Sequence, residues 1–169
     1  SVYIFKRSGT TWSEQQKLTA ASDAASEDLF GHSVAINGDY AIVGAVNNDD
    51  VPINSGSAYI FKRSGTTWSE QQKLTAGSDA ASGDQFGMSV AIYGDYAIIG
   101  AHQNDDVPSN SGSAYIFKRD GATGTWSEQQ KLTASDAGSG DFFGHSIATD
   151  GNYLIIGARN DDGFGSAYI

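Results

Sequence analysis

Residues 86–101 read FGMSVAIYGDYAIIGA, and this stretch decides the fold. Val90 and Ile92 alternate with small or polar residues, which is the period of a strand with one buried face. The apolar run after the central Gly-Asp turn predicts a second strand that is covered on both faces. The same block recurs twice, at residues 30–45 and 143–158. The chain is therefore a repeat protein.

The repeat is nearly regular along the chain. Residues 1–55 and 57–111 align without a gap and differ at ten positions, while the third unit has a longer turn and a shorter acidic loop. We divide the chain into repeats at residues 1–55, 56–111 and 112–165, followed by the start of a fourth repeat at 166–169. Because the sequence opens in the middle of this pattern, we expect a piece of a longer or processed protein.

Each repeat predicts four strands, and no segment shows a helical period, so the fold class is predicted to be all-β. In the middle of the chain the predicted strands are residues 88–92, 96–101, 113–118 and 126–132. The first two are small and apolar, the third is aromatic and the fourth is polar. This is the gradient from the axis to the rim of a propeller blade. We therefore predict a β-propeller-type array of four-stranded antiparallel blades, in which each repeat starts with the last two strands of one blade.

The composition narrows the class of protein. The chain has 169 residues, with 20 acidic and 10 basic residues, a formal net charge of −10 and no cysteine. This charge argues against nucleic acid as a partner, because phosphate binding needs a basic surface. No apolar run approaches the roughly 20 residues of a membrane span, so no membrane insertion is expected. The lack of cysteine excludes disulfides and cysteine-based metal or redox sites.

The block at residues 86–101, followed by GSAYIF at 112–117, resembles the FG-GAP repeat in its bacterial form, and the resemblance covers essentially the whole chain. That family builds the seven-bladed propeller of integrin α subunits and parts of many bacterial surface proteins. The resemblance implies an extracellular or cell-surface location and recognition of proteins or glycans. Some integrin blades hold Ca²⁺ in an acidic loop between their first two strands. Here that place is a two-residue hairpin with one carboxylate, Asp39, so the family's calcium loop is not carried over.

A different acidic loop follows the second strand of each repeat. Its carboxylates and Asn carbonyl groups are hard oxygen ligands of the kind that Ca²⁺ prefers. The candidate metal ligands are Asp49, Asp50, Asp105, Asp106, Asp161 and Asp162. No regular ligand spacing is present, so we favour solvated loops whose side chains cap their own turns. Ca²⁺ is thus a possible cofactor, and no cofactor is certain.

A second set of acidic residues precedes each Phe-Gly pair. It consists of Asp28, Asp84 and Asp141, with Asp23, Asp79 and Asp136 upstream of them. We expect these residues to close the loop that links one blade to the next, and a metal role is the alternative.

Histidines and tryptophans are the remaining site candidates. His32 and His145 occupy equivalent positions, but the middle repeat has Met88 there, which excludes an essential imidazole in every repeat. No Ser-His-Asp order, phosphate loop or His pair at metal spacing occurs, so we expect no enzymatic activity. The tryptophans are expected to pack between blades, with sugar stacking as the alternative. They are Trp12, Trp68 and Trp126.

These observations predict a non-enzymatic structural or adhesive module that mediates protein interaction or self-assembly. The alternative is a Ca²⁺-dependent, lectin-like propeller that binds glycans. Three blades are too few for a closed ring, since propellers use about four to eight. Open blades would expose apolar side chains such as Val34, Ile36 and Ile42. We therefore expect the chain to pair with itself, for example as a six-bladed ring of two copies, or to continue in a longer repeat array.

Overall fold

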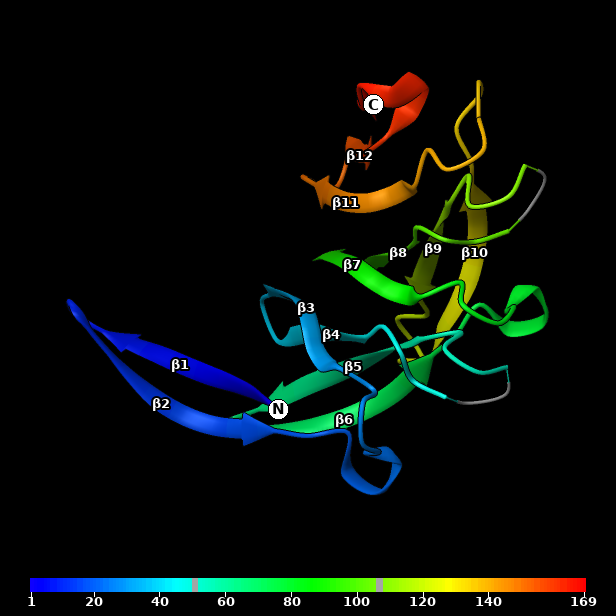
Figure 1. Cartoon of the computed structure of the whole chain (residues 1–169). Helices are drawn as coiled ribbons and strands as arrows, with labels where there is room; N and C mark the ends of the chain where they lie inside the picture. The colour runs from blue at the N-terminus through cyan, green and yellow to red at the C-terminus, as the bar shows by residue number, and fades with distance from the viewer. Residues whose placement is uncertain (50–51, 106–107) are drawn as a thin grey trace.

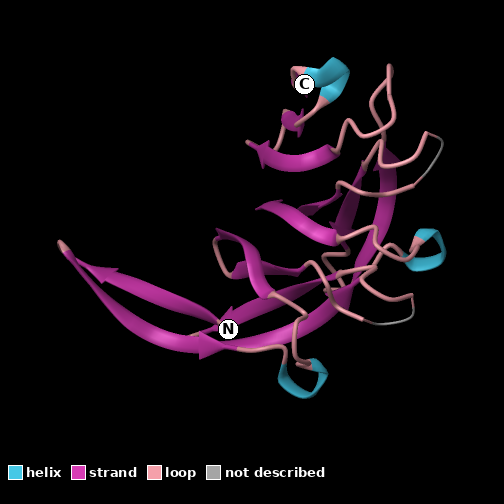
Figure 2. Ribbon diagram, in the orientation of Figure 1, coloured by secondary structure: helices cyan, strands magenta, loops and turns pink. Residues whose placement is uncertain are grey.

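The computed structural model describes residues 1–49, 52–105 and 108–169, and these residues form an all-β structure, as predicted (Figures 1 and 2). Three short 3₁₀ helices lie in the loops: η1 (Ala21–Asp23), η2 (Gly77–Asp79) and η3 (Asp161–Gly163). The strands are β1 (Val2–Ser8), β2 (Thr11–Leu18), β3 (Phe30–Asn37), β4 (Tyr40–Ala45), β5 (Ser57–Ser64), β6 (Thr67–Leu74), β7 (Phe86–Tyr93), β8 (Tyr96–Ala101), β9 (Ser113–Arg119), β10 (Trp126–Leu132), β11 (Phe143–Thr149), β12 (Leu154–Ala158) and β13 (Ser166–Tyr168).

The strands form four antiparallel sheets, which we name blades A to D. Blade A is the hairpin β1–β2, blade B is β3 to β6, blade C is β7 to β10 and blade D is β11 to β13. Within each sheet the strand order follows the sequence. The predicted strands 96–101 and 126–132 have the observed bounds, while β7 and β9 run beyond the predicted ones. The extension of β7 arises because Phe86 pairs with Ala101 across a bulge.

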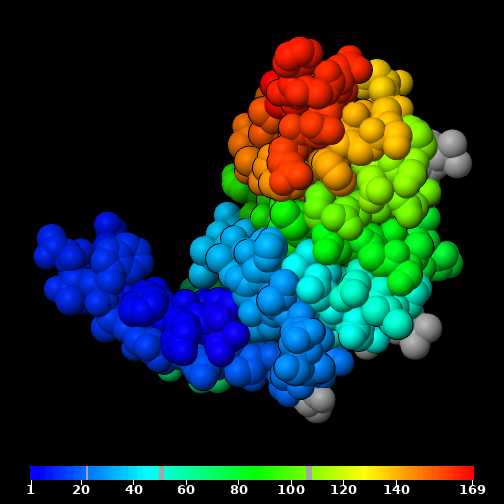
Figure 3. All heavy atoms as spheres, in the orientation of Figure 1, coloured from blue at the N-terminus to red at the C-terminus, as the bar shows by residue number. Residues whose placement is uncertain are grey.

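The blades stack side by side and do not close into a ring (Figure 1). The first strands of blades B, C and D, which are β3, β7 and β11, contact one another in turn. Blade A projects from the body of the molecule as an arm (Figure 3). No helix among the described residues is long and apolar enough to cross a bilayer.

The inner strands of neighbouring blades approach so closely that the glycine of the Gly-Ala pair in blades B and C leaves no room for a side chain. A Cβ atom on Gly44 would lie 2.1 Å from the carbonyl oxygen of Gly87 in the next blade. A Cβ atom on Gly100 would lie 2.0 Å from the carbonyl oxygen of Gly144. The serine of the adjacent strand bonds the same carbonyl, and Ser89 Oγ donates to Gly144 O at 2.7 Å. The Phe-Gly and Gly-Ala pairs of the motif are therefore the two sides of one contact between blades.

Three apolar cores fill the spaces between successive blades. The core between blades B and C combines Ile42 and Ile60 of one sheet with Phe86, Tyr115 and Trp126 of the next. Its aromatic rings meet at an angle, and the centroids of Phe86 and Tyr115 are 5.4 Å apart. Each four-stranded blade thus buries both faces of its sheet only when it has a neighbour on each side.

The prediction of exposed apolar residues is confirmed at two positions and wrong at the third. Val34 and Ile36 are 57% and 59% exposed, whereas their equivalents in blade C, Val90 and Ile92, are 8% and 6% exposed. Ile42 is fully buried. Its pairing across the β3–β4 ladder puts it on the opposite face of the sheet from Val34, and that face packs on blade C.

Candidate functional site

A glutamine side chain at the rim of blade A and of blade B holds a tryptophan of the next blade. Gln72 on β6 donates from Nε2 to the carbonyl oxygen of Trp126 at 2.7 Å, and its Oε1 accepts the Trp126 backbone N–H at 2.8 Å. The preceding residue, Gln71, accepts the indole N–H at 3.5 Å. The primary amide thus pairs with the backbone of β10 as another peptide group would. We call this arrangement the Gln–Trp clamp.

The clamp recurs one blade earlier. Gln16 on β2 donates to the carbonyl oxygen of Trp68 and accepts its N–H, both at 2.7 Å. Trp68 and Trp126 are buried, so the prediction that tryptophans pack between blades is confirmed for these two. Trp126 also packs edge-on against Tyr40 of blade B, with ring centroids 5.8 Å apart. Trp12 differs, because it lies on the projecting hairpin and is 63% exposed.

A lysine lies among the oxygen atoms of the loops at each of two blade junctions. In blade B, Lys73 Nζ lies 2.6 Å from Asp23 Oδ2 and 2.8 Å from Asn48 Oδ1. The hydroxyl of Tyr59 donates to the same carboxylate. Burial raises the pKa of Asp23, but the hydrogen bonds from Lys73 and Tyr59 outweigh it, so the pKa lies below its usual value.

Blade C repeats this arrangement with Lys131 Nζ, which is 2.6 Å from Asp79 Oδ2 and 3.0 Å from Asn104 Oδ1. Tyr115 again donates to the aspartate. We call the arrangement the lysine junction. In both copies an ammonium group of the chain occupies the place between carboxylate and amide oxygens, where a bound cation would otherwise be plausible.

The buried acids in front of each Phe-Gly pair close the linking loops, as predicted. Asp28 Oδ2 and Asp84 Oδ2 each accept a backbone N–H three residues earlier at 2.8 Å. Asp141 accepts the equivalent N–H of Gly138. Burial raises the pKa of Asp84, and its Oδ1 has no hydrogen-bond partner among the described residues. These contacts fix the entry into the first strand of each blade.

The candidate metal ligands after the second strand are dispersed. Asp49 and Asp105 cap their own loops, each accepting a backbone N–H five residues later, at 2.9 and 2.8 Å. Asp50 and Asp106 lie outside the described residues. Asp161 is buried and accepts the hydroxyl of Tyr168, and Asp162 is exposed. Within residues 1–49, 52–105 and 108–169, no three His, Asp or Glu side chains are grouped so as to hold a metal ion.

The structure pairs two histidines that the sequence does not connect. His102 is buried between blades C and D, with its ring centroid 5.5 Å from that of His145. Burial lowers the pKa of His102 to about 4, and the positive charges of His145 and Arg159 add to this. His32 lies exposed on β3. The sequence does not predict this contact. His145 is related by the repeat to His32, whereas the positions equivalent to His102 hold no histidine in the other repeats.

Acid should therefore weaken the junction between blades C and D. The pKa of His102 is about 4 in the folded chain and about 6.5 in the unfolded chain, so the unfolded chain takes up the proton first as the pH falls. The free energy of unfolding should therefore fall by on the order of 2–3 kcal/mol as the pH is lowered from 6.5 to 4.

Urea unfolding at several pH values measures this loss. His102→Val, which introduces the residue of the equivalent position, Val46, should reduce it. His32→Met, which introduces the residue found at Met88, is the matched control and should leave most of it in place, because the charge of His32 contributes least to the lowered pKa of His102. An equal acid loss in the His102→Val variant would show that another group controls it.

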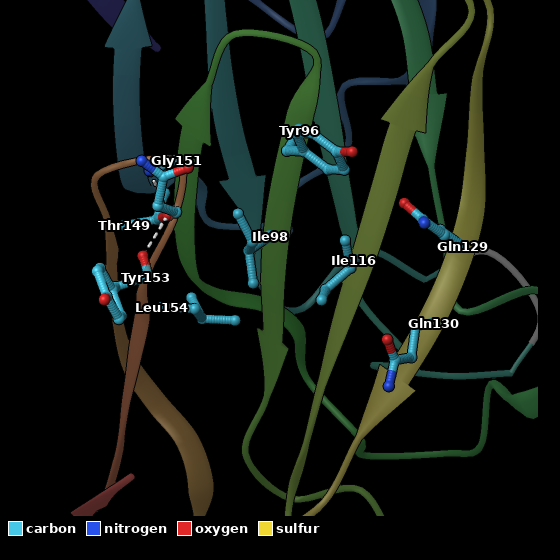
Figure 4. Close-up of a pocket in the computed structure, with 10 residues that line it drawn as sticks. Tyr96, Ile98, Ile116, Gln129, Gln130, Thr149, Gly151, Tyr153 and Leu154 are labelled. Carbon is cyan, nitrogen blue, oxygen red and sulfur yellow. Dashed lines mark hydrogen bonds between the residues drawn. The ribbon is translucent and has the colours of Figure 1, made fainter. Parts of the chain in front are cut away.

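A pocket of about 220 Å³ opens at the rim between blades C and D (Figure 4). Blade C lines it with Tyr96, Ile98 and Ile116 and with Gln129 and Gln130 of β10. Blade D contributes Thr149 and residues 151–154 from around the β11–β12 turn. The two glutamines are the equivalents in blade C of the pair that holds a tryptophan in blade B. Sequence reasoning took the Gln-Gln-Lys segment for a polar edge, although its recurrence in all three copies was a signal of a specific contact.

Sheets of up to four antiparallel strands, stacked through their inner strands, define an open array of β-propeller blades. A model of the FG-GAP repeat matches residues 12–61, 68–117 and 126–169. The chain belongs to the FG-GAP repeat family. No curated protein matches it.

Proposed function

We propose that the chain is a non-catalytic propeller module of an extracellular or cell-surface protein that works by binding proteins, foremost further blades of its own kind, in a second copy or in a longer repeat array. One observation carries this proposal. Val90 and Ile92 are buried between blades B and C, whereas the equivalent residues of blade B, Val34 and Ile36, are exposed to solvent. An apolar face of this kind is typical of an interaction surface.

The opposite end of the array offers a complementary face. Ile155 of blade D is 42% exposed, whereas its equivalents Ile42 and Ile98 are buried against the next blade. In the B–C core, the Ile42 face of one blade packs on the Val90 face of the next. The two open faces therefore match in the same way that the internal faces do, which supports head-to-tail stacking of further blades, from a second copy or from a longer repeat array.

The family supports the remaining parts of the proposal. FG-GAP repeats occur in extracellular and surface proteins, and propeller blades of this type are typically non-catalytic. The half-buried Asp23 bonds a lysine and the buried Asp84 bonds a loop backbone, as structural groups do.

Sedimentation velocity over a range of concentrations tests self-association. The wild-type chain should form a species of at least twice the mass of one chain at micromolar concentration. Ile36→Asp should shift this equilibrium toward the monomer, because it places a charge on the open face. Ile53→Ser, at an exposed loop position where the next repeat has Ser109, is the matched control. A wild-type chain that remains a folded monomer would contradict the proposal.

A Ca²⁺-dependent, lectin-like function is the second candidate. It is favoured by the recurrent Asn-Asp loops and by exposed aromatic side chains such as Trp12 and Tyr153. A ligand that binds the folded chain stabilises it by RT ln(1 + [L]/Kd). We expect the melting temperature to stay unchanged in millimolar Ca²⁺, because lysines fill two of the oxygen-lined junctions. A rise in melting temperature together with Ca²⁺-dependent binding on a glycan array would favour the lectin.

A further inference from the structure

We propose that the lysine of each lysine junction forms an isopeptide bond with the buried asparagine beside it. The bonds join Lys131 Nζ to Cγ of Asn104 in blade C, and Lys73 Nζ to Cγ of Asn48 in blade B. Each bond ties the fourth strand of a blade to the loop that follows its second strand. The reaction takes place within one chain and is independent of the self-association proposed above.

The two groups that would react are in contact in blade C. Lys131 Nζ lies 3.0 Å from Asn104 Oδ1, and because a C=O bond is about 1.2 Å long, Nζ lies within roughly 4 Å of the amide carbon. This is close to the separation of about 3–3.5 Å from which an attack proceeds. Ser113 Oγ donates to the same Oδ1 at 2.9 Å, so two donors polarise the carbonyl group. Asn104 and Ser113 are both buried, which holds this geometry and keeps water out.

Asp79 is placed to take a proton from the lysine. Its Oδ2 lies 2.6 Å from Lys131 Nζ, and the hydroxyl of Tyr115 donates to the same carboxylate and fixes it. The lysine side chain is only 21% exposed. Where water is scarce, transfer of the ammonium proton to the carboxylate replaces two charges with a neutral pair and lowers the cost of desolvation. The transfer leaves an amine, which is the nucleophilic form of lysine.

Asp84 is placed to give a proton to the leaving nitrogen. Asn104 Nδ2 donates to Asp84 Oδ2 at 3.0 Å. Asp84 is 1% exposed, and its other oxygen has no hydrogen-bond partner among the described residues. Burial raises the pKa of Asp84, so this carboxyl group holds a proton more readily than an exposed one. It is therefore suited to act as the general acid at Nδ2.

The reaction forms one C–N bond and breaks another. Asp79 takes a proton from the ammonium group, and the lone pair of Lys131 Nζ attacks Cγ of Asn104. The hydroxyl of Ser113 stabilises the negative charge that develops on Oδ1. Asp84 protonates Nδ2, and the Cγ–Nδ2 bond breaks with its electron pair on nitrogen, so that ammonia leaves. Nζ gives its second proton to Asp84, and the proton on Asp79 passes to the ammonia. The net products are a secondary amide and an ammonium ion, and no oxidant or cofactor is consumed.

Blade B carries the same constellation. Lys73 Nζ lies 2.8 Å from Asn48 Oδ1 and 2.6 Å from Asp23 Oδ2. Ser57 Oγ donates to Asn48 Oδ1 at 2.9 Å. Asn48 Nδ2 donates to Oδ2 of the buried Asp28 at 3.3 Å. A lone lysine–aspartate ion pair needs neither the serine nor the second carboxyl group, whereas the reaction uses both.

The mass of the denatured wild-type chain tests the proposal. We expect it to be lower than the mass of the sequence by two molecules of ammonia. A tryptic digest should contain two branched peptides, one joining Lys131 to Asn104 and one joining Lys73 to Asn48, because trypsin does not cleave after a lysine whose Nζ is acylated. A wild-type chain with the full mass of its sequence would overturn the proposal, and so would a digest without branched peptides.

Variants of the full chain assign each loss of ammonia. Lys131→Arg keeps a positive charge beside Asp79 but removes the nucleophile, since a guanidinium group stays protonated. It should lose one molecule of ammonia instead of two, and Asp84→Asn should do the same because the general acid is gone. Lys118→Arg, at an exposed lysine of β9, is the matched control and should still lose two.

Succinimide formation is the other route by which the chain could lose ammonia, at Asn37, which precedes a glycine. The double variant Lys73→Arg, Lys131→Arg distinguishes the two routes. The isopeptide reaction predicts that this variant has the full mass of its sequence. A loss of ammonia that persists in the double variant at the wild-type level would contradict the cross-links.

Discussion

Replacing Trp126 with alanine should lower the free energy of unfolding by about 3–5 kcal/mol, the range expected for truncation of a fully buried aromatic side chain. The indole is 2% exposed, fills the core between blades B and C and bonds Gln71 through its N–H. Its removal leaves a cavity between two sheets that are held by their inner strands and cannot easily close over it.

Trp12→Ala is the matched control, because Trp12 stands in the same Thr-Trp-Ser-Glu-Gln-Gln-Lys segment but is 63% exposed. In dilute solution, below the concentration of association, it should change stability by less than about 0.5 kcal/mol. Urea unfolding monitored by circular dichroism measures both values. Equal losses in the two variants would mean that the rim tryptophans do not join the blades.

Gly100→Ala should cost about 3 kcal/mol or more, at the upper end of what overpacking usually costs. The added methyl group would lie 2.0 Å from the carbonyl oxygen of Gly144, which is backbone and cannot rotate away. To accommodate it, β8 and β11 must separate, and the hydrogen bond from Ser89 to the same carbonyl would be lost.

Gly157→Ala provides the comparison at the equivalent position of blade D. There the new Cβ would meet only Ser146, whose hydroxyl can rotate to another position. We expect a change within about 1 kcal/mol for this variant in dilute solution. Thermal unfolding of the two variants measures the difference, and similar melting temperatures would contradict the close approach of blades C and D.

The blade architecture could be predicted because it depends on local patterns that recur. The alternation at Val90 and Ile92, the Gly-Asp turn and the polar fourth strand each specify one element, and three copies specify the stacking. The exposure of Val34 was predicted from the same repeat pattern, because an open blade leaves this face of its sheet uncovered. Ile42 was assigned to the wrong face because strand alternation fixes which residues share a face but not which face meets the neighbouring blade.

The contacts of the candidate site could not be predicted, because each joins residues from separate repeats. Gln72 and Trp126 are 54 residues apart, and only the offset between neighbouring blades brings the amide to the tryptophan backbone. Lys73 and Asp23 are 50 residues apart. Sequence patterning shows that these residues are polar and recurrent, whereas the three-dimensional stacking of blades decides that they meet.

The central claim of the proposed function is that the open apolar faces of blades B and D pack on further blades in the way that the internal faces do. The emission spectrum of the wild-type chain as a function of concentration tests it most directly, because Trp68 and Trp126 are buried and Trp12 is the exposed indole. The account predicts a shift of the emission to shorter wavelength over the same concentrations at which the mass increases. A spectrum that stays fixed while the chain associates, or a chain that does not associate at all, would contradict it.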